Sequence, residues 1–247
     1  MKQVQITLTP GESKRIIAMG VKKLPVIQQA LAKGTILITL GSTNAYVVEE
    51  LTGKKIDRPR YAAGYINGRT SALAMDKRLT AIALKNGKEV NSDGIINEMT
   101  SSDVVIKGAN ALGTDGIAGV MMSNPVGGTT GGFMGPVMAK GINLIIPVGI
   151  EKSIPYSVLN ISKRIGIQRS TKATGFAVGM MPLPGTVITE VEALKLLGAQ
   201  DVFPIGSGGV DGGEGCVTLC VEGDKAEEIF ELVEKVKEKK GEWVATQ

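Results

Sequence analysis

The sequence predicts an α/β fold built on a parallel sheet. Short apolar runs rich in β-branched residues recur along the chain, and each is followed by a glycine-containing turn and a segment with helical spacing. The composition is that of an ordinary globular protein: 43% of the 247 residues are hydrophobic and 21% are charged. A packed core is therefore expected, divided into one large and one small unit.

Two helices are expected near the start of the chain. Thr9 is a suitable N-cap, Pro10 occupies the first helical position, and Glu12 stands three residues after the cap, which completes a capping box. A second helix is expected over residues 25–33, where apolar residues recur at helical intervals until Gly34.

Strands and helices then alternate. The expected strands are 35–40, 104–106, 117–122 and 143–148, and the expected helices between them are 44–52 and 133–140. A further pair of strands is expected around a turn at Asn86-Gly87. Because the strands are almost wholly apolar, both faces of the sheet should be covered. A parallel, Rossmann-like sheet with helices on both faces is therefore the expected architecture of residues 1–185.

The C-terminal part, residues 186–247, predicts a small α+β subdomain of the form β-α-β-β-α. Its expected elements are a strand at 187–188, a helix over 191–197, strands at 202–205 and 217–221, and a helix over 224–240. Apolar residues at three- and four-residue intervals along the last helix indicate a core-facing stripe.

Several classes of protein are excluded by composition. The chain contains no histidine, so a Ser-His-Asp or Cys-His centre and histidine-ligated metals are excluded. No metal site and no cofactor is expected. Cys216 and Cys220 lie four residues apart in one expected strand, about 13 Å from each other at ~3.3 Å per residue, which is too far for a disulfide. With no signal-peptide core and no long apolar segment, we expect a cytoplasmic protein without membrane contact.

Charge is distributed unevenly. The net charge is +4, from 28 Lys and Arg against 24 Asp and Glu, but Glu151 is the only acid between residues 116 and 189. The basic residues of that stretch are Lys140, Lys152, Lys163, Arg164, Arg169 and Lys172. This excess favours a small anionic ligand. A solvated surface explains any single basic residue equally well. Nucleic acid is a weaker interpretation of the excess, because aromatic residues are few and no nucleic-acid-binding motif occurs.

The first candidate site is the turn formed by Gly41, Ser42, Thr43 and Asn44. A strand ends before it and a helix begins within it, so hydroxyl groups and free backbone N–H groups meet the positive end of a helix. Such a turn binds anions, although a plain Ser/Thr N-cap has the same sequence.

The second candidate is the glycine-rich segment 124–132. Its proposed ligand-binding residues are Gly127, Gly128, Thr129, Thr130 and Gly131. Four glycines and two threonines between a strand and a helix allow a ligand to approach the backbone closely. If the sheet is parallel, this segment and the first turn lie at the same edge, where α/β proteins bind ligands.

The third candidate is the segment 206–215, which carries Asp211 and Glu214. It is not a dinucleotide fingerprint, because a strand follows it. It is either a lid, a carrier of an acid to the cleft, or a wide hairpin connection.

Lys107 ends the expected strand 104–106, and Asn110 and Asp115 follow it. A lysine and an amide at the carboxyl end of a strand can bind an oxyanion, and Asp115 could orient one of them or act as a base.

These residues resemble the superfamily that contains ribose-5-phosphate isomerase, glucosamine-6-phosphate deaminase and the CoA transferases. Gly41-Ser42-Thr43 is similar to the phosphate loop of the isomerases, and 107–110 stands where their Asp-Gly-Ala-Asp falls. Segment 127–132 stands where their Lys-Gly-Gly-Gly falls, and 145–148 with 151–153 resembles the strand and acidic region beyond it. The resemblance spans roughly residues 35–153.

The chain departs from the family at the catalytic carboxylates. Lys107 and Asn110 replace both aspartates, and 134–136 replaces the acid-Lys pair. The resemblance therefore implies binding of a sugar phosphate or other anionic metabolite, with Lys107 stabilising negative charge and Asp115 or Glu214 as the acid–base group of an enzyme. Alternatives are acyl-CoA chemistry through Glu214 and a non-enzymatic metabolite-sensing or assembly module. Homo-oligomerisation is compatible with this fold.

Overall fold

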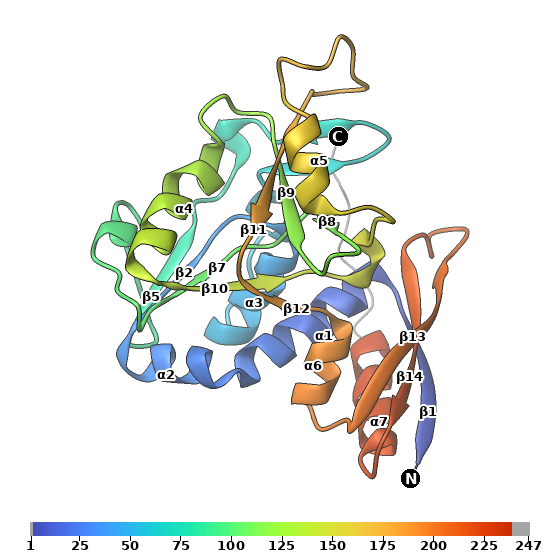
Figure 1. Cartoon of the computed structure of the whole chain (residues 1–247). Coiled ribbons are helices and arrows are strands. Elements are labelled where there is room, and N and C mark those ends of the chain that lie inside the picture. Colours follow the sequence, from blue (N-terminus) through green and yellow to red (C-terminus); the bar gives the residue numbers. More distant parts are fainter. Residues whose placement is uncertain (1, 239–247) are drawn as a thin grey trace.

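The computed structural model describes residues 2–238, which form a mixed α/β structure (Figure 1). Its helices are α1 (Pro10–Lys23), α2 (Pro25–Lys33), α3 (Ser42–Thr52), α4 (Gly128–Lys140), α5 (Val158–Arg164), α6 (Glu190–Leu196) and α7 (Ala226–Glu238). Its longer strands are β1 (Gln3–Leu8), β2 (Thr35–Ile38), β5 (Ile82–Lys85), β7 (Val104–Ile106), β9 (Ala118–Met122), β10 (Asn143–Pro147), β11 (Gly179–Leu183), β13 (Asp201–Gly208) and β14 (Cys216–Glu222). The short strands are β3 (Gly64–Ile66), β4 (Thr70–Ala72), β6 (Lys88–Val90), β8 (Ala111–Leu112) and β12 (Thr186–Ile188).

The central sheet has six strands in the order β12-β10-β7-β2-β5-β6. The first four are parallel to one another, whereas β5 and β6 are antiparallel to their neighbours. The sheet is therefore mixed rather than wholly parallel. At the turn Asn86-Gly87 both residues have positive φ (51° and 73°), and they fold β5 back into β6 as a hairpin. The sequence predicted this hairpin correctly.

Both faces of the central sheet are buried, as the apolar strands predicted. Ile36 and Ile38 of β2 point into a core shared with α1, α2 and α3, while Leu37 points into a second core shared with α4. In β7, Val104 and Ile106 point into the first core and Val105 points into the second. Helices therefore cover both faces of the sheet.

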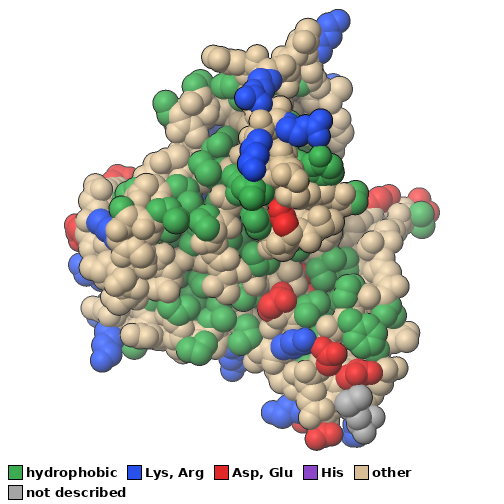
Figure 2. Space-filling model, viewed as in Figure 1, with side chains coloured by type: hydrophobic (Ala, Val, Ile, Leu, Met, Phe, Trp, Pro, Cys, Tyr) green, Lys and Arg blue, Asp and Glu red, His purple; other side chains and the backbone are tan. Residues whose placement is uncertain are grey.

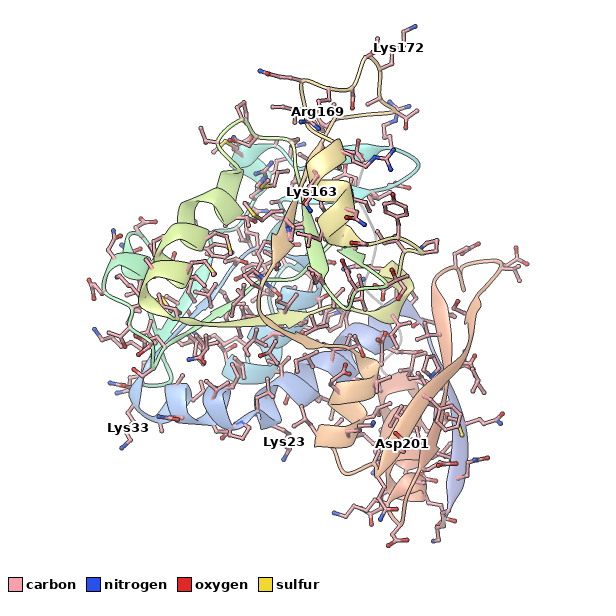
Figure 3. The ribbon with its side chains drawn as sticks, in the orientation of Figure 1. Lys23, Lys33, Lys163, Arg169, Lys172 and Asp201 are labelled. Atoms are coloured by element: carbon pink, nitrogen blue, oxygen red, sulfur yellow. The ribbon has the colours of Figure 1, made fainter. Side chains whose placement is uncertain are left out.

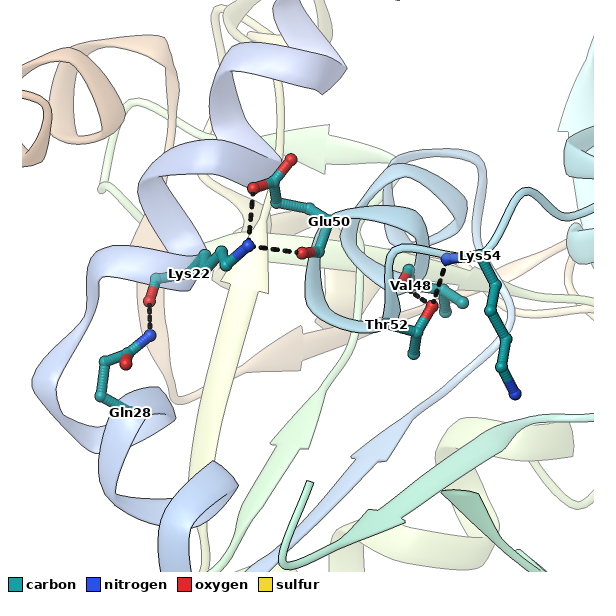
Figure 4. A network of polar contacts seen from close by, with 6 residues as sticks. All are labelled: Lys22, Gln28, Val48, Glu50, Thr52 and Lys54. Carbon is teal, nitrogen blue, oxygen red and sulfur yellow. Dashed lines mark hydrogen bonds and ion pairs between the residues drawn. The ribbon is translucent and has the colours of Figure 1, made fainter. Parts of the chain in front are cut away.

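The ends of α1, α2 and α3 are joined by polar contacts (Figure 4). The Nζ of Lys22 donates to the carbonyl oxygen of Glu50 at 2.9 Å and to its Oε1 at 3.1 Å, and Gln28 donates to the carbonyl oxygen of Lys22 at 2.6 Å. The Lys22–Glu50 pair is partly exposed, so it contributes at most about 1 kcal/mol. At the other end of α1, the capping box of Thr9 and Glu12 forms as predicted.

A second sheet, β1-β14-β13, is antiparallel and is covered by α7. The strand predicted at 187–188 is β12, which pairs in parallel with β10 of the central sheet, and the N-terminal strand β1 completes the second sheet instead. Sheet membership therefore does not follow a division at residue 186. The two sheets share one hydrophobic core, in which Leu8 and Val217 belong to the same cluster as Ile36. Of the helix predicted over 224–240, residues 239 and 240 lie outside the described residues.

A third sheet, β8-β9-β11, lies over the α4 face of the central sheet (Figure 1). Strand β9, predicted at 117–122, belongs to this antiparallel sheet and not to the central one. Within residues 2–238, no helix combines the length and the apolar character that crossing a bilayer requires.

Candidate functional site

A cleft with a volume of about 400 Å³ lies where β2 and β7 end. The first turns of α3 and α4 both line it, so the two glycine-containing turns, 86 residues apart from Gly41 to Gly127, meet at one place. The loop after β7 and Lys152, which follows β10, complete its polar wall. The hairpin β3-β4 and Phe176 form its rim.

The α3 wall is fixed by Tyr61. Its hydroxyl donates to the carbonyl oxygen of Ile38 at 2.6 Å and accepts the N–H of Ile82 at 3.2 Å, so it bridges β2 and β5. The backbone N–H of Gly41 donates to the carbonyl oxygen of Tyr61 at 2.8 Å. The N–H of Gly41 is therefore used by the protein itself, and Ser42 and Thr43 are the residues that present this helix terminus to the cleft.

Asn44 has a structural role. Its Nδ2 donates to the carbonyl oxygens of Thr39 at 2.8 Å and of Ile106 at 3.1 Å, and the side chain is fully buried. These bonds tie the carboxyl ends of β2 and β7 together. Asn44 is not among the described residues that line the cleft, so its predicted contact with a ligand gains no support from the geometry.

The α4 wall begins earlier than predicted. Helix α4 starts at Gly128 rather than at residue 133, so most of the predicted glycine-rich loop is the first turn of a helix. Gly127 precedes it with a φ of 81°, a conformation that favours glycine. Gly127, Gly128, Thr129 and Thr130 line the cleft.

Gly131 serves the packing of this wall. It is absent from the cleft lining of the described chain, and a Cβ at this position would collide with the carbonyl oxygen of Val126. The tight turn before α4 thus explains the glycine at this position.

The floor of the cleft carries Lys107, Asn110 and Lys152. The Nζ of Lys107 donates to the carbonyl oxygen of Gly108 at 3.1 Å, and the Nζ of Lys152 donates to that of Ala109 at 2.9 Å. Asn110 accepts the N–H of Met121 through Oδ1 at 3.0 Å, which joins the floor to β9. Both lysines are half-buried. Burial, and then the positive charge of Lys152, lower the pKa of Lys107 to about 8.

The charge of the cleft is one-sided. Lys107, Lys152 and Arg78 line it, and among residues 2–238 no Asp or Glu does. Sequence reasoning missed Arg78 and Lys152 as site residues. Lys152 belongs to a motif that carries the family resemblance, whereas no local sequence signal marks Arg78. The Nε of Arg78 donates to the carbonyl oxygen of Leu73 at 2.6 Å.

Behind the floor lies a buried group of opposite charge. Glu190 is fully buried, and its Oε2 accepts the N–H of Ile150 at 2.9 Å. Burial raises the pKa of Glu190, and it lowers the pKa of Lys14 and of Lys152. Glu151 and Glu190 oppose this effect at Lys152 because their negative charges favour its protonated form.

The two predicted acid–base residues do not line the cleft of the described structure. Asp115 accepts the hydroxyl of Ser157 at 2.6 Å and backbone N–H groups at the start of α5, and the hydrogen bond from Ser157 is the main cause of its lowered pKa. Glu214 lies in the turn between β13 and β14, where it accepts the N–H of Gly212 at 3.0 Å. Asp115 therefore ties its own turn to the start of α5, and Glu214 serves the turn in which it lies.

Most of the basic stretch also lies elsewhere. Lys163, Arg164, Arg169 and Lys172, here called the basic outcrop, are exposed on α5 and the loop after it. Figure 2 shows blue side chains gathered there, and Figure 3 labels three of them at the top of the view. Lys140 donates to the carbonyl oxygens of Ile96, Asn97 and Met99 instead. Of the basic stretch, only Lys152 lines the cleft.

Comparisons with protein-family models, with curated proteins and with solved structures found no significant match. The function is therefore argued from the geometry of the cleft. Within the described range 2–238, no cluster of three or more Cys, Asp or Glu side chains could hold a metal ion.

Proposed function

We propose that the cleft binds a small phosphorylated or otherwise anionic metabolite, of which a sugar phosphate is the leading example. The observation that carries the proposal is the convergence of two helix N-termini and three cationic side chains on a cleft that no described carboxylate lines. Free N–H groups at a helix N-terminus favour negative charge, and the lysines add positive potential in a partly dehydrated site.

Buried polar atoms beside the cleft support this proposal. Thr43 lines the cleft, and its buried Oγ1 has no hydrogen-bond partner among the described residues. Such atoms are uncommon in native interiors and call for a partner. A hydroxyl can both donate and accept, so a ligand oxygen that reaches this atom would satisfy it.

The finer expectations from the sequence belong to the same proposal. A Rossmann-like protein binds its ligand beyond the carboxyl ends of parallel strands, which is where β2, β7 and β10 end here. The family resemblance adds a sugar-phosphate isomerase-like enzyme without the usual catalytic carboxylates. Acid–base chemistry in this cleft then falls to Lys107 and Lys152. Homo-oligomerisation stays a prediction.

Two alternatives remain distinct from this proposal. Acyl-CoA chemistry through Glu214 gains no support from the geometry, because Glu214 is outside the cleft and engaged in its own turn. A metabolite-sensing or assembly module without catalysis is compatible with a cleft that lacks carboxylates. Turnover of a bound compound would distinguish an enzyme from such a module.

Thermal unfolding with added compounds tests the proposal. Sugar phosphates, inorganic phosphate, CoA and acyl-CoA are compared, since a ligand at 100 times its Kd stabilises the folded state by about 2.7 kcal/mol. Stabilisation by sugar phosphates but not by CoA supports the proposal, whereas stabilisation by CoA alone supports the acyl-CoA alternative. If neither phosphates nor CoA raise the midpoint, the cleft is not an anion site.

A pair of double variants locates the binding. Replacing Ser42 and Thr43 together with Val removes both hydroxyls from the α3 wall and should abolish the stabilisation by phosphate. The same replacement of Ser170 and Thr171, an exposed Ser-Thr pair outside the cleft, is the matched control and should leave it unchanged. Equal affinity in both double variants would exclude the α3 turn as part of the site.

A further inference from the structure

The ionisable groups of the cleft are unusual for a site that performs acid–base chemistry. Among the described residues that line it, the titratable side chains are Lys107, Lys152, Arg78 and Tyr65. An arginine is effectively always protonated, and Tyr65 is part of the exposed rim. The two lysine amines are thus the groups at the cleft floor that can take part in proton transfer.

The backbone anchors both amines to one loop, where the charge of Lys152 acts on Lys107. Lys107 donates to the carbonyl oxygen of Gly108 and Lys152 to the next carbonyl oxygen, that of Ala109. The two residues reach this loop from different strands, Lys107 from the end of β7 and Lys152 from beyond the end of β10. Two neighbouring positive charges disfavour each other, so one amine has a reason to be neutral.

The surroundings decide which amine is neutral. Carboxylates of Glu151 and Glu190 lie close enough to Lys152 to favour its ammonium form, whereas Lys107 has no such partner in the described chain. Lys107 is therefore the amine that loses its proton first. This arrangement, a desolvated lysine next to a second cation, is one way in which proteins create a nucleophilic amine.

We propose that Lys107 is a nucleophile that forms an imine with the carbonyl carbon of a small anionic aldehyde or ketone bound in the cleft. This inference rests on the proposed anion site, because the helix N-termini of α3 and α4 would hold the anionic group while the carbonyl carbon meets Lys107. It assigns the ligand a second required feature, a reactive carbonyl group, beyond its negative charge.

The chemistry balances without an oxidant or a cofactor. The neutral amine of Lys107 adds to the carbonyl carbon, a C–N bond forms, and one amine proton moves to the oxygen to give a carbinolamine. The ammonium of Lys152 donates a proton to the carbinolamine hydroxyl, which leaves as water. Loss of the remaining N–H proton to the neutral amine of Lys152 gives the imine and restores that ammonium, so the net change is amine plus carbonyl to imine plus water.

The protonation state favours Lys107 over other lysines. With a pKa lowered to about 8, Lys107 is half neutral at pH 8. An ordinary lysine with a pKa near 10.4 is less than about 1% neutral at that pH. The nucleophilic form of Lys107 is therefore much more abundant than that of an exposed lysine such as Lys163.

Reductive trapping tests the inference. The full chain is incubated with glyceraldehyde 3-phosphate and sodium cyanoborohydride, and the modified lysine is located by peptide mass spectrometry. We expect one main adduct, at Lys107, formed at least tenfold faster than with unphosphorylated glyceraldehyde, with a rate that rises to half its maximum near pH 8. Excess inorganic phosphate should protect Lys107.

Variants and an independent binding measurement complete the experiment. Lys107→Arg keeps the charge but cannot form an imine, so the main adduct should disappear, whereas Lys163→Arg should retain it. Phosphate binding to the wild-type chain is measured in parallel by calorimetry. If phosphate binds but Lys107 is not labelled, the imine is refuted and the anion site stands. If phosphate does not bind, both are refuted. Main labelling at Lys152, or equal labelling of surface lysines, also overturns the inference.

Discussion

The cleft and the basic outcrop draw cations from the same stretch of sequence, and the structure puts them in opposite surroundings. Lys152 is half-buried between the cleft and the acidic side chains Glu151 and Glu190. Lys163 and Lys172 of the outcrop are exposed (Figure 3). Positive charge in water is screened over about 8 Å at physiological salt, but in a partly dehydrated cleft it acts at nearly full strength.

The comparison teaches that residue type alone does not define this site. The basic stretch suggested an anion site because of its excess positive charge, but five of its six cations are exposed. What distinguishes the cleft is the loss of water around a few groups together with the first turns of two helices.

Removing the charge of Lys152 should have the largest effect. Lys152→Gln can keep the hydrogen bond to Ala109 but lacks the positive charge at the cleft floor. Loss of the charged hydrogen bond from Lys152 to the bound anion costs about 1.5–3 kcal/mol of binding free energy. The Kd for inorganic phosphate should therefore rise about 10- to 150-fold in calorimetry. Lys163→Gln is the control and should bind as the wild type does. Equal weakening in both variants would remove the distinction between the cleft and the outcrop.

Adjacent glycines of α4 should respond in opposite directions. Gly131→Ala places a Cβ against the carbonyl oxygen of Val126 and should destabilise the fold by about 1–3 kcal/mol. Gly132→Ala meets nothing within 4 Å and should stabilise the helix by up to about 1 kcal/mol. Chemical denaturation measures both changes. Similar stabilities for the two variants would show that the turn before α4 is not tightly packed.

The dependence of stability on pH should reveal Lys107. Its pKa is lowered from 10.5 to about 8 in the folded chain, so between these values the unfolded chain binds more protons and stability rises with pH. Lys107→Met removes this titration. We expect the variant to be more stable than the wild type below pH 8, and the gain to shrink as the pH rises from 8 to 10.5. A constant difference in melting temperature across that range would contradict the burial of this amine.

The basic outcrop should tolerate loss of its charge. Replacing Lys163, Arg164, Arg169 and Lys172 with Gln should change stability by no more than about 0.5 kcal/mol per residue, because exposed side chains make few contacts. At physiological salt the affinity for phosphate should change less than about twofold, since the charges are screened. A larger loss of affinity would mean that the outcrop contributes to the anion site.

Local signals predicted most of the helices and strands. The capping box at Thr9, the turn at Asn86-Gly87 and the glycine after α2 act within a few residues, and each formed as expected. The apolar runs of β2, β7 and β10 predicted strands buried on both faces because a strand with no polar face must be covered on both sides.

The sequence was less informative where partners are distant in the chain. The start of α4 was placed at Phe133 because glycines and threonines disfavour helices, yet packing of Gly131 against Val126 begins the helix at Gly128. The pairing of β1 with β14, 219 residues apart at Gln3 and Glu222, has no local signal. The hydrogen bonds that Asp115 accepts from the start of α5 likewise join segments more than 40 residues apart and have no local signal.

For this protein the sequence by itself determined the elements and the chemical kind of groups at two turns, because caps, turns and hydrophobic periodicity depend on neighbouring residues. The tertiary structure decided which groups share a cleft and which are solvated. Lys152 and Lys163 are the same residue type in the same basic stretch. Lys152 is partly buried beside Lys107 and acts on its charge, whereas Lys163 is exposed to water and has no such effect. Desolvation and proximity are properties of the folded chain, and they set the charge state on which a binding site depends.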